Sequence, residues 1–316
     1  VYIVEEALYS DRSETDLAAS LELIMAELAQ PAADEFSPLE LSSLNFQSHI
    51  EQAAFEKMVE EARSLIRQGD MFQCVLSQRF SAEYSGRPLD YYRNLRVTNP
   101  SNYLYFYDFG DYQIIGASPE SLVSVKQGQV TTNPIAGTRP RGKDEREDKA
   151  LAEELLADEK EVAEHRMLVD LGRNDIGKIA QNNSVEVTKY MEVEYFRYVM
   201  HLTSVVRGQL LPQLTAMDAL KSTLPAGTVS GAPKIRAMKR IYELEQEKRG
   251  VYAGAIGYLS ATGDMDFAIA IRTMILKNGR AYVQAGAGIV YDSIPANEYQ
   301  ETINKAKSMT KIGEMQ

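Results

Sequence analysis

Apolar residues recur at helical spacing along several segments of the chain and follow the shorter period of β-strands in others. A helix over residues 49–68 is predicted by apolar residues three or four positions apart, namely Ala54, Met58, Ala62 and Leu65. Gly69 and Asp70 end this helix. Similar patterns predict helices near residues 14–29, 88–97, 143–170, 215–223, 232–247 and 296–312.

Between the helices, short apolar runs bounded by turn residues predict β-strands. They cover residues 1–4, 71–82, 103–109, 112–117, 121–126, 129–135, 184–194, 198–210, 253–261, 265–277 and 280–290. The last three are expected to form a meander, because Thr262-Gly263-Asp264 and Asn278-Gly279 are short hairpin connections. Strands joined by hairpins, with helices between the sets, predict an α+β fold of mainly antiparallel sheets covered by helices, arranged as one domain.

Composition and charge exclude several classes of function. The chain has 316 residues, a net charge of −11 and a pI near 5.0, which argues against a nucleic-acid partner because phosphate binding needs clustered Lys and Arg. No apolar stretch of the sequence reaches the roughly 18–20 residues of a membrane span. The single cysteine, Cys74, excludes an internal disulfide and favours a reducing, cytoplasmic location. Its apolar neighbours favour a buried strand position over a nucleophile.

Two segments near the C-terminus combine small residues with a cation. Ala268, Ala270 and Arg272 share one face of a predicted strand, which leaves room beside a guanidinium that can bind a carboxylate with two hydrogen bonds. An exposed arginine at a sheet edge is the plainer interpretation. The run Ala-Gly-Ala-Gly at 285–288 indicates close approach of a ligand to the backbone, or else a tight contact between sheet and helix.

Two predicted helices carry carboxylates that could share a metal ion. Glu298, Glu301 and Lys305 lie on one stripe of the last helix, and Glu161 and Glu164 lie on the long charged helix before it. Mg²⁺ needs few protein carboxylates because it keeps several of its waters. Ordinary solvated faces would look the same, and the spacing leaves open whether the two helices meet.

Two glycine-containing loops suit an anion. Residues 134–142 put Gly137 and Thr138 at a strand end, and residues 227–234 lead into a helix whose N-terminal dipole favours negative charge. Neither loop matches the nucleotide-binding pattern GxxxxGK[ST], so a nucleotide substrate is not expected.

Taken together, these strings resemble the chorismate-utilising enzyme family. They are GASPE at 116–120, PIAGT at 134–138, AEHRMLVDLGRND at 163–175, MHLTS at 200–204, GTVSGAPK at 227–234, AIAIRT at 268–273, AGAG at 285–288 and EYQETINK at 298–305. The resemblance covers residues 45–312 in the family's order. It implies one large domain of two antiparallel sheets with helices outside, acting on chorismate with Mg²⁺. Residues 1–48 would be the remnant of an N-terminal region that contributes to the first sheet, and residues 49–316 the catalytic domain.

The resemblance implies binding roles for individual residues. Glu164 and Glu301 would bind Mg²⁺, which would hold the ring carboxylate of the substrate. Lys305 would add positive charge near that carboxylate. The residues expected to bind the pyruvyl carboxylate are Tyr252, Arg272, Gly286, Ala287 and Gly288. Those expected to line the ring are Gly137 and Thr138.

The resemblance also implies catalytic roles. Glu120 would protonate the departing 4-hydroxyl, which requires a carboxyl kept protonated by its surroundings. His201 and Thr228 match positions in the same pocket, and His201 would assist the later loss of pyruvate unless it is a structural histidine. Gln73 stands where water-using relatives carry a lysine base, which favours ammonia as the nucleophile. Ala136 stands where aminodeoxychorismate synthases usually carry a nucleophilic lysine.

These two positions favour the anthranilate synthase branch, whose large subunit receives ammonia from a separate glutamine amidotransferase subunit in a hetero-oligomer. An aminodeoxychorismate synthase that works without the lysine is the alternative enzyme. An inactive regulatory or scaffold subunit is the alternative of another class, and the presence of all four expected acids and cations disfavours it. The chain begins at Val1 without methionine, so we expect the first part of a longer protein to be missing. Tryptophan binding is not predicted, because only Asn99–Leu104 resembles part of an inhibitor site.

Overall fold

The computed structural model describes residues 13–30, 44–245 and 247–311. The chain divides into two units, residues 1–38 and 39–316, and each is considered by itself. In the first unit, α1 (Glu14–Ala29) confirms the predicted helix. It begins with a capping box in which the Ser13 hydroxyl accepts a hydrogen bond from the Asp16 amide, and the Asp16 carboxylate accepts one from the Ser13 amide.

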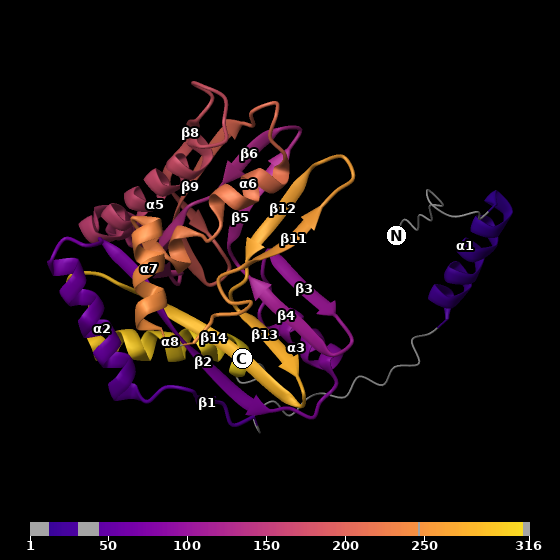
Figure 1. The fold of residues 1–316 in the computed structure, drawn as a ribbon, viewed down its shortest axis with the longest axis horizontal. Coiled ribbons are helices and arrows are strands. Elements are labelled where there is room, and N and C mark those ends of the chain that lie inside the picture. The colour runs from indigo at the N-terminus through magenta and orange to yellow at the C-terminus, as the bar shows by residue number, and fades with distance from the viewer. Residues whose placement is uncertain (1–12, 31–43, 246, 312–316) are drawn as a thin grey trace. The chain divides into compact units, whose positions relative to one another are not determined.

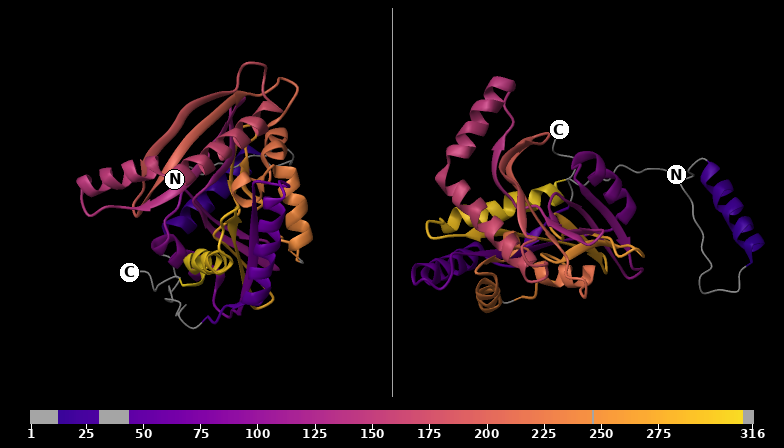
Figure 2. Two further views of the ribbon diagram at one scale, coloured as in Figure 1. Left: turned by 90° about the vertical axis from the view of Figure 1, so that its left-hand side faces the viewer. Right: turned by 90° about the horizontal axis from the view of Figure 1, so that it is seen from above.

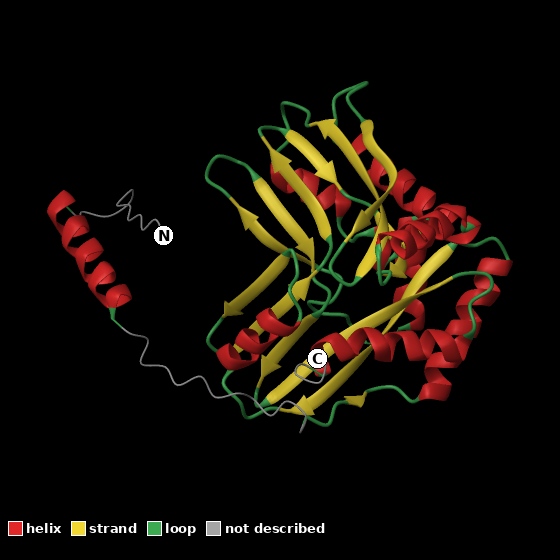
Figure 3. Cartoon of the chain, turned by 180° about the vertical axis from the view of Figure 1, so that it is seen from behind, coloured by secondary structure: helices red, strands yellow, loops and turns green. Residues whose placement is uncertain are grey.

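In its described residues, the second unit is built on two sheets of seven strands each (Figures 1 and 3). Across the first sheet the order is β1 (Gln47–Ser48), β2 (Gln73–Glu83), β14 (Arg280–Ile289), β13 (Thr273–Lys277), β4 (Tyr112–Ser118) and β3 (Tyr103–Asp108), and β10 (Gly231–Ala232) also pairs with β2. Across the second sheet it is β11 (Ala255–Leu259), β12 (Met265–Ile269), β5 (Ser121–Lys126), β6 (Gln129–Thr132), β9 (Val199–Gln209) and β7 (Ile135–Pro140), and β8 (Glu186–Tyr195) also pairs with β9. The pairs are antiparallel, which confirms the α+β class.

Helices cover both sheets, and Figure 2 gives two further views of these layers. They are α2 (Gln52–Arg67), α3 (Pro88–Thr98), α4 (Glu145–Ala157), α5 (Glu159–Gly177), α6 (Ala216–Thr223), α7 (Lys234–Leu244) and α8 (Pro295–Thr310). Apolar side chains of α2, α3, α7 and α8 form the buried clusters on the first sheet. Those of α5 and α6 form the cluster on the second sheet. A short 3₁₀ turn, η2 (Gly227–Val229), precedes β10.

Helix α2 exists as predicted, but the prediction of its buried face is wrong by one position. The buried residues are Phe55, Val59, Ala62 and Ile66. Ala62 is the one residue shared with the predicted stripe, whereas Ala54 is exposed and Met58 and Leu65 lie at the edge of the cluster. Phe55 and Ile66 bury more apolar area than the alternative stripe offers, so the helix turns them towards the sheet.

Two predicted elements are each divided in the structure. The helix expected over 143–170 is α4 followed by α5, because Asp158 leaves the helical conformation and its carboxylate accepts hydrogen bonds from the amides of Lys160 and Glu161. The strand expected over 129–135 ends at Thr132, and β7 follows as a separate strand.

The predicted meander of the last three strands is wrong. Residues 265–277 form β12 in the second sheet and β13 in the first, so the chain changes sheets between them. Arg272 lies at this change with a φ of +49°, which no continuous strand can hold. Both predicted turns are present, and the Asn278-Gly279 turn has φ values of 51° and 71°, as a type I′ hairpin turn requires.

Other predictions can be placed directly. Cys74 is buried on β2, as predicted, and burial raises the pKa of its thiol to about 12. β1 pairs with Phe80 and Ser81 of β2, whereas the strand expected over residues 1–4 lies outside the described residues. None of the helices in the described ranges combines the length and the apolar character that a membrane span needs.

Candidate active site

A cavity of about 1260 Å³ has walls from both sheets and from two helices. The first sheet contributes β2 and β14, the second contributes β7 and β9, α5 and α8 supply charged side chains, and η2 lies at one side. The predicted site residues that line it are Gln73, Glu120, Thr138, Glu164, His201, Thr228, Tyr252, Arg272, Gly286, Gly288, Glu301 and Lys305. Residues from across 232 positions of the sequence, Gln73 to Lys305, are thus brought together.

Two predicted residues do not line the cavity with their side chains. Gly137 has a φ of +66° at an irregularity between β7 and β9, and its carbonyl accepts a hydrogen bond from His201 Nδ1 at 2.8 Å. Ala287 is fully buried in the apolar cluster under α2 and α7. Because side chains alternate along a strand, the Ala287 methyl group points to the opposite face from Gly286 and Gly288.

One corner of the cavity suits a carboxylate. Burial lowers the pKa of Arg272, while Tyr252, Glu120 and Glu301 act in the opposite direction, so the guanidinium stays charged among them. Burial raises the pKa of Tyr252 to about 12, which keeps its hydroxyl available as a donor. A Cβ atom on Gly286 would lie 2.6 Å from the Tyr252 hydroxyl, so this close approach requires glycine.

The edge of β14 adds backbone donors to this corner. β13 pairs with β14 only up to Val283, so among the described residues the rest of β14 has a strand neighbour on the β2 side alone. Opposite Gly288 and Gly286, the amides of Val75 and Ser77 point away from β14, since they donate to Ser230 and Glu245. Residues paired in this way on antiparallel strands both turn their N–H groups outward. The amides of Gly286 and Gly288 therefore face the open edge of β14.

One carboxyl group on the cavity wall has a pKa close to neutral pH. Burial raises the pKa of Glu120 to about 7, while a hydrogen bond from Thr228 and the charges of Lys305 and Arg272 lower it. Thr228 Oγ1 donates to Glu120 Oε1 at 2.7 Å. A carboxyl with such a pKa can give up a proton near neutral pH.

His201, which also lines the cavity, is held in one tautomer. Its Nδ1 lies 2.8 Å from the Gly137 carbonyl, which can only accept, so Nδ1 carries the proton. The Thr138 hydroxyl lies 3.1 Å from the same nitrogen. In the neutral ring, Nε2 is then left as an acceptor.

Two helices present acids to the same cavity. Glu164 of α5 accepts a hydrogen bond from Gln73 Nε2 at 3.1 Å, and Glu301 of α8 forms an ion pair with Lys305 at 2.6 Å. Burial and then the charge of Glu164 raise the pKa of Glu161, and burial raises that of Glu298, with Glu301 acting in the same direction. Among the described residues, no three His, Cys, Asp or Glu side chains already form a metal-binding cluster.

The amide of Gln73 has one unpaired atom. Its side chain is only 4% exposed, and Oε1 has no hydrogen-bond partner within the described part of the chain, although Nε2 binds Glu164. An orphaned acceptor in a buried polar wall indicates a place for a ligand N–H or O–H group.

Sequence reasoning missed Gln284, which also lines the cavity. It precedes Gly286 and Gly288 at strand spacing, so the same alternation that places the two glycines could have placed it.

Comparison with known proteins fits this geometry. A family described as chorismate binding enzyme matches residues 1–311. The chain belongs to this family. The fold of the chain is therefore that of a chorismate-binding enzyme.

Individual members of the family differ in similarity to this chain. Anthranilate synthase component 1 of Lactococcus lactis subsp. lactis is 59% identical over 311 residues, which cover 98% of this chain and 68% of that protein. A crystal structure of anthranilate synthase component I from Streptococcus pneumoniae TIGR4 has 77% identity and a TM-score of 0.91, covering 98% of this chain and 69% of that one. The structure of the menaquinone-specific isochorismate synthase of Escherichia coli has a TM-score of 0.80 at 25% identity, and the match covers 95% of this chain and 69% of that one. The chain spans between 53% and 63% of several other curated relatives described as anthranilate synthase component 1.

Proposed function

We propose that this chain converts chorismate and ammonia into anthranilate, pyruvate and water with the help of Mg²⁺, the first committed step of tryptophan biosynthesis. The observation that carries the proposal is one cavity lined by a carboxylate-binding corner at Arg272 and by two acids from different helices, Glu164 and Glu301. Chorismate carries two carboxylates, so these two halves can hold it at both ends. The similarity to anthranilate synthase components supports the same product.

The pyruvyl carboxylate is assigned to the corner formed by Arg272, Tyr252 and the edge of β14. A guanidinium, a neutral phenol and two outward amides supply enough donors for both carboxylate oxygens. The donors are fixed before substrate arrives, since Gly286 packs against the Tyr252 hydroxyl and its carbonyl accepts a hydrogen bond from Lys305 Nζ at 3.1 Å. Fixed donors bind without a large loss of side-chain freedom.

Glu164 and Glu301 would hold the magnesium ion. The fit is good because the carboxylates of Glu164, Glu298 and Glu301 all line the cavity, and such hard oxygen donors suit Mg²⁺. Burial raises the pKa of Glu298, and the charge of Glu301 acts in the same direction. When bound, Mg²⁺ supplies positive charge that turns this acidic wall into a site for the ring carboxylate. Lys305 adds further positive charge beside Glu301.

Glu120 is assigned the proton transfer to the departing 4-hydroxyl. Ammonia adds at ring carbon 2 as the bond from carbon 4 to oxygen breaks, and the proton from Glu120 lets that oxygen leave as water. His201, with Nε2 as an acceptor, would remove the proton from ring carbon 2 as the bond from the ring to the enolpyruvyl oxygen breaks, so that the ring becomes aromatic. The released enolate takes up one proton and leaves as pyruvate. Thr228 keeps the Glu120 carboxyl oriented through its 2.7 Å hydrogen bond.

Gln73 favours ammonia over water as the nucleophile. Its unpaired Oε1 can accept a hydrogen bond from ammonia, and its Nε2 is fixed by Glu164, which sets the direction of the amide. An amide cannot remove a proton from water, whereas ammonia is already a nucleophile as the free amine. Ala136, also in the cavity wall, cannot form the covalent bond of a nucleophilic lysine, which disfavours an aminodeoxychorismate product.

A glutamine amidotransferase subunit is proposed as the source of ammonia in the cell. Its support is the name of the relatives: a protein called component 1 of anthranilate synthase implies a second component. The single cysteine supports a cytoplasmic setting for this assembly.

Product identity tests the proposal. The chain is mixed with chorismate, Mg²⁺ and an ammonium salt, and the products are separated and followed by the fluorescence of anthranilate. Anthranilate with an equal amount of pyruvate is the expected result. Release of 4-amino-4-deoxychorismate or of isochorismate as the final product, without pyruvate, would overturn it.

A further inference from the structure

A buried ion pair lies directly behind the cavity wall. The Arg249 and Glu245 side chains are only 16% and 7% exposed, and they are joined by two hydrogen bonds of 2.8 and 2.7 Å. Neither residue lines the cavity, so neither touches the substrate. Charged groups this well buried keep their charge only when all their hydrogen-bonding groups are satisfied.

The ion pair completes an edge of the first sheet. β10 pairs with β2 only at Gln73 and Cys74, and beyond this point Arg249 Nη2 donates to the Val75 carbonyl at 2.6 Å. Glu245 Oε1 accepts from the Ser77 amide at 2.7 Å. One side chain therefore supplies the donor, and the other the acceptor, that a neighbouring strand would have supplied.

The same ion pair contacts three walls of the cavity. Arg249 Nη1 donates to the carbonyl of Val229 at 2.6 Å, one residue after Thr228, and the guanidinium lies 5.4 Å from the centre of the Tyr252 ring. Glu245 accepts a second hydrogen bond from the Ser77 hydroxyl at 2.9 Å.

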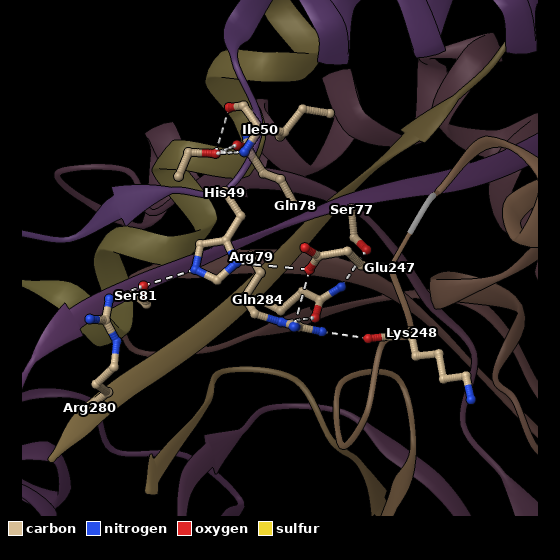
Figure 4. Close-up of polar contacts among 11 residues, drawn as sticks. His49, Ile50, Ser77, Gln78, Arg79, Ser81, Glu247, Lys248, Arg280 and Gln284 are labelled. Atoms are coloured by element: carbon tan, nitrogen blue, oxygen red, sulfur yellow. Dashed lines mark hydrogen bonds and ion pairs between the residues drawn. The ribbon is translucent and has the colours of Figure 1, made fainter. Parts of the chain in front are cut away.

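Ser77 extends these contacts to the third wall. Its hydroxyl oxygen accepts from Gln284 Nε2 at 2.9 Å, and Gln284 lines the cavity on β14 (Figure 4). Arg79 Nε approaches the Gln284 amide oxygen at 3.4 Å from the other side, so both ends of this amide are held.

We propose that Arg249 and Glu245 are positioning residues that hold Tyr252, the Thr228 turn and Gln284 in register around chorismate. The inference rests on the proposed function, because the substrate defines what must be in register. One fork-shaped guanidinium binds the β2 edge, η2 and Glu245 at once, through donors that point in three directions. Loss of the fork frees two walls of the cavity from each other. Displacement of binding groups by about 1 Å is enough to weaken a reaction roughly 100-fold.

The effect is expected in two steady-state quantities that a loss of folded protein would not change. Without the fork, Tyr252 leaves the carboxylate corner, so KM for chorismate rises. Thr228 also loses its fixed position, and its hydrogen bond to Glu120 weakens. Since that bond lowers the pKa of Glu120, while Lys305 and Arg272 remain beside it, the high-pH limb of kcat/KM moves to higher pH.

Arg249→Lys and Arg249→Met test the proposal, together with Glu245→Gln. Lysine keeps the charge opposite Glu245 but cannot bind both carbonyls, and methionine keeps most of the volume without any donor. Both arginine variants are expected to raise KM for chorismate by about tenfold or more and to shift the high-pH limb upward, with Glu245→Gln showing a smaller change. Compared with Arg249→Met, Arg249→Lys should restore much of the thermal stability but little of the affinity for chorismate that KM reports.

Arg240→Met is the matched control. Arg240 of α7 also forms ion pairs, at 2.6 Å with Asp70 and 2.5 Å with Glu243, but contacts no cavity residue. It should lower the unfolding midpoint and leave KM and the pH limb unchanged. The proposal is overturned if every folded variant of Arg249 and Glu245 keeps the wild-type KM and pH limb, even when its stability falls. If the wild type makes no anthranilate, the proposed function fails instead, so the two failures are distinguishable.

Discussion

The Glu120 carboxyl shows how one residue acquires a chemical role from its surroundings. Burial alone would leave it strongly protonated, and the Thr228 hydroxyl, Lys305 and Arg272 bring its pKa back to about 7. Its folded-state pKa is therefore raised above the ordinary 4.5, and the protonated form that donates is present below pH 7 and lost above it.

We expect kcat/KM to fall about tenfold per pH unit above pH 7 if Glu120 is the proton donor. Glu120→Gln keeps an acceptor for Thr228 but has no acidic proton, so kcat should fall by about 10²–10⁴-fold with little change in KM for chorismate. Steady-state rates across the pH range measure both effects. A glutamine variant with near wild-type kcat would remove Glu120 from the mechanism.

Gln73 is the residue that decides the nucleophile in this account. Gln73→Lys places an amine beside Glu164 at a position where a base could activate water. The variant should lose anthranilate formation and release isochorismate, which product chromatography would detect. Unchanged products from a folded variant would show that Gln73 does not select the nucleophile.

Individual site residues were predictable to different degrees. Arg272 and the glycines of 285–288 stand out because small residues flank them, and the sequence order of the family strings supplied Glu120 and His201. Arg249 and Glu245 could not be found in this way. In a sequence, a glutamate and an arginine four residues apart indicate an ordinary solvated helix face. Only the folded chain shows that both are buried behind Tyr252.

Among the elements, β14 has two different edges. Up to Val283 it is paired on both sides, and from Gln284 onward its outer edge is open to the cavity. The change arises because the chain enters the first sheet only after Arg272, so β13 begins at Thr273 and does not reach past Val283 of β14. A ligand can therefore use backbone amides that a longer β13 would have covered.

Gly286→Ala tests this open edge. The new methyl group would lie 2.6 Å from the Tyr252 hydroxyl and 3.0 Å from the Leu76 carbonyl, so it should displace Tyr252 and raise KM for chorismate by about tenfold. Gly208→Ala on β9 is the control, because its Cβ would also crowd a neighbour, at 2.6 Å from Ile176, away from the cavity. If both variants change KM equally, general strain explains the effect.

The elements that the sequence placed wrongly share a physical cause. The alternation of residues 267–272 continues up to Arg272, yet the chain crosses there between two sheets, because alternation reports burial on each side and not which sheet is nearby. The buried face of α2 was predicted one position away because two stripes of apolar residues on this helix satisfy the helical period. Packing against β2 and β14 selects the stripe that contains Phe55. Tertiary contacts decide both cases.

In the whole molecule, the chain lacks an accessible thiol for glutamine hydrolysis. Its only cysteine, Cys74, is buried with a pKa of about 12 and cannot act as a thiolate. We expect anthranilate from free ammonium and none from glutamine until an amidotransferase subunit is added. Anthranilate formed from glutamine by the purified chain alone would contradict the division of labour proposed for the two subunits.

The fold joins two acids that are 137 positions apart in the sequence, Glu164 on α5 and Glu301 on α8, at one cavity. The sequence suggested each of them separately. It could not show that α5 and α8 line the same cavity, since that depends on where each helix packs against its sheet. The central claim is that these two carboxylates share one divalent ion.

Binding of Mn²⁺, followed by electron paramagnetic resonance in the presence of chorismate, tests this claim most directly. We expect one tightly bound ion per chain, with affinity reduced by about tenfold or more in both Glu164→Gln and Glu301→Gln. Glu61→Gln, which removes an exposed acid of α2, should bind like the wild type. Wild-type affinity in both cavity variants, or the loss of binding in only one of them, would contradict a shared ion.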